Sequence, residues 1–219
     1  MVKSSRPHRL VYLCDWLPPD FGAVGQYSLL FARARAAAGA EVVLGGLSST
    51  TASVVEVVEE THGGGRLRVV RIPTRTYDRA NFRTRAAWTL RTNLRLLWRL
   101  RRDLVAADEI LFTGSPPFLL HFLVPLNLLL RKQLTYRITD FHPECLLAEL
   151  GRAPLLLRWF YRLTLALRRR VHRFEVLGED QRRRLLEIGI PEARILLARD
   201  PSPVEIPPGP APLELPAPL

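Results

Sequence analysis

Short apolar runs alternate along the chain with longer segments of helical periodicity. The short runs lie at His8–Cys14, Glu41–Leu44, Leu67–Ile72, Glu109–Phe112, Leu134–Ile138, Phe174–Leu177 and Arg194–Leu197. Continuous runs of this kind are typical of strands that are buried on both faces. Helices are predicted at Gln26–Ala38, Thr84–Val105, Phe118–Arg131, Pro154–Arg170 and Asp180–Ile188. Val54–Glu60 fits a short helix or a strand, and Gly63–Gly65 predicts a turn.

This alternation of strands and helices predicts an α/β fold, a Rossmann-like parallel sheet with helices on both faces. Such sheets bind ligands at the carboxyl ends of their strands, at the point where the strand order reverses. The loops that follow predicted strands are therefore the places to look for chemistry. They are Asp15–Gly25, Thr113–Pro117 and Thr139–Glu144.

The composition narrows the class of protein. The chain has 219 residues, of which 47% are hydrophobic and 24% charged, so a wholly disordered chain is excluded. Cys14 and Cys145 are its two cysteines and match no zinc spacing, which predicts free thiols, no disulfide scaffold and no metal site. We expect no resident cofactor. The apolar stretch Phe118–Leu130 is too short to span a bilayer and predicts a buried or interfacial helix.

The two ends of the chain suggest its location and domain organisation. The apolar run Leu10–Cys14 is too short for a signal-peptide core, which predicts a cytoplasmic protein. Residues 1–200 are expected to form one domain. In residues 201–219, eight of 19 are proline, which excludes a helix or an inner strand and predicts an extended linker or tail.

Positive charge is concentrated in one part of the sequence. The net charge is +11, and the segment from Arg66 to Arg102 alone holds twelve arginines and a single acid, Asp78. In the predicted helix Thr84–Val105, four leucines fall on one face and four arginines form a stripe on another, with Trp88 and Trp98 among them. The leucines are Leu90, Leu94, Leu97 and Leu104, and the arginines are Arg91, Arg95, Arg99 and Arg102.

A second basic stripe follows later in the chain. It consists of Arg158, Arg162, Arg169 and Arg173, near Trp159 and Tyr161. Basic helices that carry tryptophan suit an anionic membrane surface, which would place the protein peripherally at the inner face of the membrane. A solvated charged face is the plain alternative. Single-stranded nucleic acid also binds such surfaces, but no strand-end loop favours it, so we expect no nucleic-acid partner.

The first strand-end loop has glycines that suit a phosphate group. Gly22-Ala23-Val24-Gly25 opens a predicted helix, where glycine lets the backbone approach a ligand and the helix start offers free N–H groups. The pattern is neither GxGxxG nor a Walker loop, because it lacks the Lys-Ser/Thr ending. A strand-to-helix turn that simply needs glycine explains it equally well.

The other two loops carry polar and ionisable groups. Asp140, His142 and Glu144 follow one strand, Ser115 follows another, and Asp15 ends the first. Ionisable groups in a strand-end crevice can do acid–base or hydrogen-bonding work. The alternative for the Asp140 loop is a capped helix start, with Pro143 and Glu144 in the first turn.

Taken in order, four segments resemble glycosyltransferase family 4, which has the two-domain GT-B fold. Tyr12–Leu47 is similar to the opening strand, glycine loop, helix and strand of that family. Leu111–Pro117 resembles its strand that ends in Ser-Pro-Pro, and Ile138–Glu144 resembles the Asp-x-x-Pro-Glu turn of members that build cell-surface polysaccharide. Phe174–Asp200 is similar to the last unit of its N-terminal domain.

The resemblance implies transfer of a sugar from a nucleotide sugar to an acceptor, usually with retention. It implies that Gly22, Ala23, Val24 and Gly25 face the donor diphosphate. It also implies that Asp15, Ser115, Asp140, His142 and Glu144 lie on the acceptor side. The basic helices would rest on a membrane that carries a lipid-linked acceptor.

The chain departs from the family in one large respect. Family members have a second domain with most of the nucleotide-sugar contacts and a glutamate pair eight residues apart. Glu179 and Glu187 have that spacing but lie in the first domain. We therefore expect a glycosyltransferase N-terminal domain that needs a donor-binding partner domain and transfers no sugar alone. The alternative is a non-catalytic module that binds a membrane surface or a partner and has kept the fold.

Overall fold

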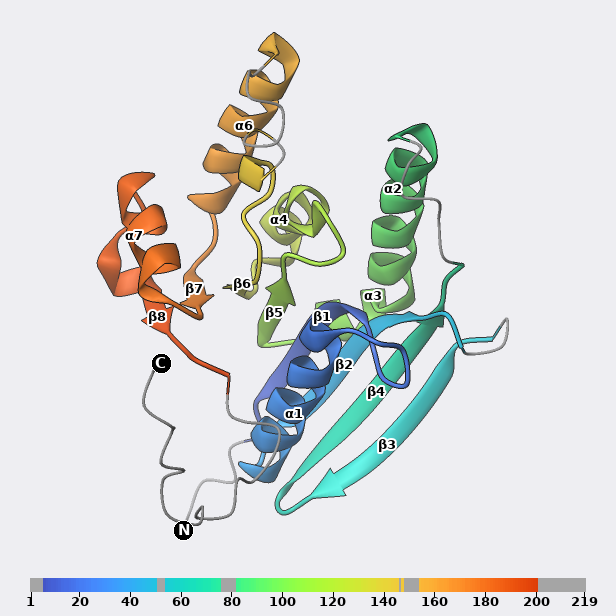
Figure 1. Cartoon of the computed structure of the whole chain (residues 1–219). Coiled ribbons are helices and arrows are strands. Elements are labelled where there is room, and N and C mark those ends of the chain that lie inside the picture. The colour runs from blue at the N-terminus through green and yellow to red at the C-terminus, as the bar shows by residue number, and fades with distance from the viewer. Residues whose placement is uncertain (1–5, 51–53, 76–81, 146, 148–153, 201–219) are drawn as a thin grey trace, which may run out of the picture.

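The protein is built around one eight-stranded sheet. The computed structural model describes residues 6–50, 54–75, 82–145, 147 and 154–200, and the sheet has the strand order β3-β4-β2-β1-β5-β6-β7-β8 (Figure 1). All neighbouring strands are parallel except β3 and β4, which form an antiparallel hairpin. The strands are β1 Arg9–Trp16, β2 Glu41–Ser48, β3 Glu56–His62, β4 Gly65–Pro73, β5 Glu109–Thr113, β6 Gln133–Ile138, β7 Arg173–Val176 and β8 Ile195–Leu197.

Helices cover the two faces of the sheet unequally. On one face α1 (Ala23–Ala37) packs over β1, β2 and β4 around a core that includes Leu10, Tyr12 and Leu44. The remaining described helices belong to the opposite side, whose core includes Leu96, Phe112 and Leu123. They are α2 Phe82–Arg99, α3 Arg101–Ala106, α4 Leu119–Leu130, α6 Leu155–Arg168 and α7 Glu179–Glu187, and a 3-10 turn, Glu192–Arg194, precedes β8.

The structure confirms the predicted α/β Rossmann-like sheet and corrects several details. The undecided segment Val54–Glu60 contributes to strand β3, in which half-buried Val58, Glu60 and His62 alternate with exposed residues as a half-exposed strand requires. The prediction of a single helix over Thr84–Val105 is wrong, because Leu100 separates two helices, α2 and α3. Residues 201–219, expected to form a tail, lie outside the described residues.

The strand order reverses beside β1. From β1 the chain continues to β2 beside it, then to β3 at the edge of the sheet and back to β4 between β3 and β2. Helices α2 and α3 then carry it to β5 on the other side of β1. The carboxyl ends of β1 and β5 therefore adjoin, and β6 lies next to β5. This edge is where ligands bind in open parallel sheets. Within the described ranges, no helix is both long and apolar enough to cross a bilayer.

Candidate functional site

The loop after β1 is fixed by contacts with the neighbouring strands. The Leu17 N–H donates to Leu47 O at 2.9 Å, and Arg71 Nε of β4 donates to Pro18 O at 2.7 Å. Asp20 accepts from Ser48 Oγ at 2.7 Å and from the Ser49 N–H at 2.9 Å. Burial alone would raise the pKa of the Asp20 carboxyl, but these bonds hold it below its ordinary value. The loop is therefore preformed.

The start of α1 lies directly against the end of β1. A Cβ on Gly25 would stand 1.8 Å from Trp16 O, so this position accepts only glycine. Gly22, the N-cap, has a φ of 178° and space for a side chain, with nothing nearer than 3.8 Å. Within the described part of the chain, no side chain caps the helix. The first-turn N–H groups of Ala23 and Val24 thus stand at a helix start that presents backbone alone.

Asp15 is a half-buried acid at this edge. Its Oδ1 is buried and has no hydrogen-bond partner among the described residues. Burial raises the pKa of Asp15 to about 6; the nearby Asp140 carboxylate adds a smaller upward shift, and hydrogen bonding from Trp16 and Ser115 opposes both. Near pH 6 the carboxyl exchanges a proton readily, as a general base or acid must.

The raised pKa of Asp15 predicts a pH-dependent stability. Between about pH 4 and 6 the folded state holds a proton that the unfolded state has lost, so this carboxyl destabilises the fold progressively as the pH rises through 6. We expect Asp15→Asn to raise the free energy of unfolding at pH 8 by roughly 2 kcal/mol and to flatten its slope between pH 4 and 6. Urea titrations at several pH values measure this. Glu59→Gln, which removes an exposed acid from edge strand β3, is the control, and an unchanged slope in Asp15→Asn would contradict the assignment.

The loop after β5 is held from two sides. Thr113 Oγ1 donates to Ser115 O at 2.6 Å, and Asn93 Nδ2 of α2 donates to Pro117 O at 3.0 Å. A Cβ on Gly114 would approach Thr139 Oγ1 at 3.2 Å and Asp140 O at 3.3 Å. The loops after β5 and β6 are therefore in contact, and Ser115 lies close enough to Asp15 to affect its pKa.

In the loop after β6, the three predicted polar residues have different surroundings. Asp140 is exposed and His142 is half-buried. Glu144 forms an ion pair with Arg168, a fully buried residue of α6 that also donates to His142 O at 3.0 Å. Arg168 Nη2 donates to Glu144 Oε2 at 2.9 Å, and Nη1 donates to Oε1. Glu144 thus holds the loop in place through Arg168, a partner that could not be identified from the sequence.

An aromatic cluster packs beside this loop. His121 of α4 stacks on Phe160 of α6 with ring centroids 4.5 Å apart, and Phe118 meets both rings edge-on. The His121 Nε2 lies 2.9 Å from Thr164 Oγ1. Burial lowers the pKa of His121 to about 4, so the ring is neutral at physiological pH. Sequence reasoning missed His121 and Arg168, because nothing in their local spacing shows that α4 and α6 meet.

Unsatisfied polar atoms gather at this edge of the sheet. Five buried side-chain atoms lack a hydrogen-bond partner among the described residues, and all lie in or against the loops after β1, β5 and β6. They are Asp15 Oδ1, Asn93 Oδ1, His121 Nδ1, Thr139 Oγ1 and Arg168 Nε. Each such group costs about 1–3 kcal/mol unless water or a ligand satisfies it. Internal water molecules ordinarily satisfy groups buried in this way, so the interior beneath these loops is polar.

The predicted basic helix is an exposed surface. Arg91, Arg95, Arg99 and Arg102 are all exposed, and Arg95 Nη1 donates to Pro73 O at 2.7 Å. The four leucines predicted on one face differ in burial. Leu97 and Leu104 are buried, whereas Leu90 and Leu94 are about half exposed. The exposed stripe therefore combines Leu90, Leu94 and Trp98 with the arginines.

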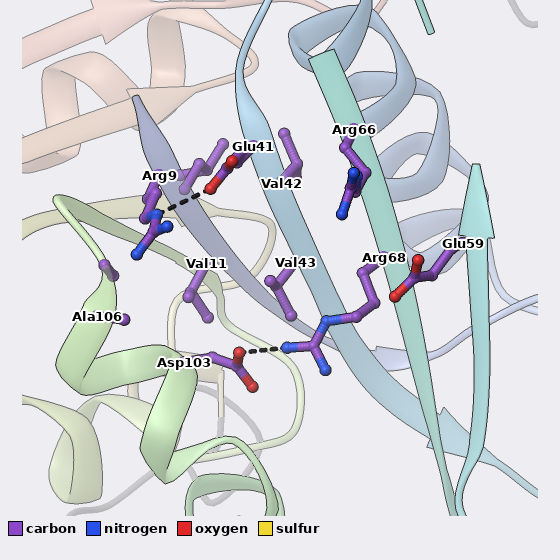
Figure 2. A pocket seen from close by; sticks show the side chains of 12 residues that line it. Arg9, Val11, Glu41, Val42, Val43, Glu59, Arg66, Arg68, Asp103 and Ala106 are labelled. Carbon is purple, nitrogen blue, oxygen red and sulfur yellow. Dashed lines mark hydrogen bonds and ion pairs between the residues drawn. The ribbon is translucent and has the colours of Figure 1, made fainter. Parts of the chain in front are cut away.

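A pocket of about 330 Å³ lies at the opposite, amino-terminal edge of the sheet (Figure 2). Its floor includes Val11 and Val43, and its charged rim is largely compensated. Arg9 Nε donates to Glu41 Oε2 at 2.8 Å, and Arg68 pairs with Asp103. None of the five unsatisfied atoms lines this pocket, so the carboxyl edge is the better candidate site.

Solved structures to which the chain is similar in fold include glycosyltransferases. The chain matches α,α-trehalose 6-phosphate synthase from Burkholderia multivorans with a TM-score of 0.50 and 13% identity, over 83% of this chain and 42% of that one. It also matches a glycosyltransferase from Rickettsia africae with a TM-score of 0.49 and 9% identity, over 89% and 43%. The chain thus spans less than half of each. No family model and no curated protein matches the sequence. The likeness supports a glycosyltransferase-like fold, as one GT-B half has.

Proposed function

We propose that this chain is the acceptor-binding N-terminal domain of a nucleotide-sugar-dependent glycosyltransferase of family 4 type. It would act in cell-surface polysaccharide or glycolipid synthesis, with retention at the anomeric carbon. A donor-binding domain would supply most of the nucleotide-sugar contacts. The observation that carries the proposal is the start of α1, which no described side chain caps, beside the loops after β1, β5 and β6 at the edge where the strand order reverses.

The residues at this edge divide between donor and acceptor. Gly22, Ala23, Val24 and Gly25 would face the donor diphosphate, because a helix start without a side-chain cap offers N–H groups and a partial positive charge. Asp15, Ser115, Asp140 and His142 would contact acceptor hydroxyls. With its pKa near 6, Asp15 is the group best suited to take a proton from an acceptor hydroxyl. Glu144, through Arg168, positions the Asp140 loop.

The exposed stripe of α2 suggests where the acceptor is located. Leu90, Leu94 and Trp98 lie among exposed arginines, which is the composition of helices that lie on anionic bilayers. A lipid-linked acceptor at the inner face of a membrane would fit this surface. The same observation favours the second candidate function, a non-catalytic module that binds a membrane surface.

A pair of substitutions at Gly22 tests the donor side. Asp and Asn cap helices about equally well, and Gly22 has room for either, so both variants should be as stable as the wild type. Gly22→Asp places a carboxylate where the diphosphate would bind, whereas Gly22→Asn does not. Phosphorus-31 NMR line broadening of UDP, GDP and ADP with the full chain measures the binding. We expect Gly22→Asp to bind about tenfold more weakly than Gly22→Asn, because both side chains can cap the same N–H groups and only Asp adds a negative charge.

The outcomes separate the candidate functions. Equal nucleotide binding by both variants would show that the diphosphate does not bind at the start of α1. No broadening of any nucleotide, even at millimolar concentration, would contradict the transferase proposal and favour the non-catalytic module.

A further inference from the structure

The first two turns of α6 carry large apolar side chains that nothing in the described structure covers. Leu155, Leu156 and Trp159 are 83%, 78% and 62% exposed. In Figure 1 this end of α6 extends beyond α4 and the sheet. Exposed apolar groups this close together are unusual on a soluble surface and mark an interaction site. We call Leu155, Leu156 and Trp159 the α6 tip.

The inward face of the same helix is already used. Phe160 packs on Phe118 and His121, Thr164 meets His121, and Arg168 binds Glu144. These positions recur every four residues, so they share one side of the helix. The α6 tip therefore lies outside the face of α6 that packs against the rest of the protein. At 1.5 Å per residue its members stand about 14–20 Å along the helix from Arg168.

The charge around the α6 tip selects its partner. The sequence from Pro154 to Phe174 contains six arginines and no acid. Arg158 and Arg162 are exposed beside Trp159. The first turn of α6 has no acidic residue, and no side chain among the described residues caps it. A tryptophan and two leucines with flanking arginines fit the boundary between acyl chains and phosphate headgroups. The uncapped N–H groups suit the same phosphates.

We propose that the α6 tip inserts into an anionic lipid bilayer and that α6 holds the carboxyl edge of the sheet above it. Because Arg168 joins α6 to Glu144 and His142 O, the loop after β6 would keep a fixed height above the headgroups. This inference rests on the proposed function, since a lipid-linked acceptor would have to reach that loop. It differs from the α2 stripe in naming which residues enter the bilayer.

The test uses the full chain with phosphatidylcholine–phosphatidylglycerol vesicles at a 3:1 ratio, some made with lipids brominated on the acyl chain. Bromine quenches the fluorescence of a tryptophan that reaches the acyl region. We expect quenching of the wild type that Trp159→Phe largely abolishes and Trp98→Phe retains. We also expect Leu155→Ser/Leu156→Ser to weaken vesicle co-sedimentation at least tenfold. The matched control, Ala166→Ser, changes an exposed position of the same helix and should bind like the wild type.

Several results would overturn the proposal. One is quenching that Trp159→Phe leaves unchanged; another is vesicle binding that the double serine variant retains. A third is equal binding to vesicles of pure phosphatidylcholine, which would show that the arginines do not select anionic lipid. Self-association of the wild type that the double variant abolishes, without vesicle binding, would assign the α6 tip to a second copy of the chain. Nucleotide binding is measured without lipid, so failure of this proposal and failure of the proposed function are distinguishable.

Discussion

Replacing Gly25 by alanine is expected to destabilise the protein by at least about 3 kcal/mol, a large part of the stability of an ordinary domain. The new Cβ would lie 1.8 Å from Trp16 O and 2.8 Å from Trp16 C. Both are backbone atoms of β1, so no side-chain rotation can relieve the contact. The start of α1 would have to move away from the strand. Guanidinium unfolding followed by circular dichroism measures the loss.

Gly22→Ala is the matched control for this prediction. Its nearest atoms are 3.8 Å away and its backbone is extended, so only the N-cap preference changes, by less than about 1 kcal/mol. If Gly25→Ala proved as stable as Gly22→Ala, the close packing of α1 on β1 would be wrong. The preformed loop that we propose faces the diphosphate would then lose its structural basis.

Replacing Arg168 by methionine is expected to cost about 3–5 kcal/mol. Arg168 is fully buried and binds both carboxylate oxygens of Glu144, so its loss leaves a partly buried carboxylate without its cation. The loop after β6 would also lose the hydrogen bond to His142 O. Thermal unfolding measures the first effect, and faster amide hydrogen exchange in the loop measures the second.

Two further variants isolate the ion pair. Arg162→Met removes an exposed arginine from the same helix and should change stability by less than about 0.5 kcal/mol. Glu144→Leu/Arg168→Met removes both charges and should be more stable than the sum of the single effects predicts, because no uncompensated charge remains. Additive effects would show that Arg168 and Glu144 do not act as a pair.

Most of the fold could be predicted from the sequence because strands buried on both faces leave continuous apolar runs. Strand β1 coincides with such an apolar run, and helix α1 follows an Ala- and Leu-rich segment that ends before Gly39. The break at Leu100 could not be predicted, since leucine and arginine favour helix and carry no termination signal. The exposure of Leu90 and Leu94 depends on which face of α2 meets the sheet, which is a tertiary property.

The candidate site was predictable in position more than in detail. The loops after β1, β5 and β6 follow from topology alone, and the structure brings Asp15, Ser115 and Asp140 close together. The roles of His121 and Arg168 depend on contacts between α4, α6 and a loop far away in sequence. Local periodicity contains no information on such contacts.

The most direct test of the central claim is a nitrogen-15 amide map of the full chain titrated with a nucleoside diphosphate such as UDP. If the carboxyl edge is the functional edge, chemical shifts change in residues 15–26 and 113–118. The chemical shifts of amides around the amino-edge pocket, at Arg9, Glu41 and Arg66, should not change. Shift changes confined to that pocket, with none at the start of α1, would contradict the account.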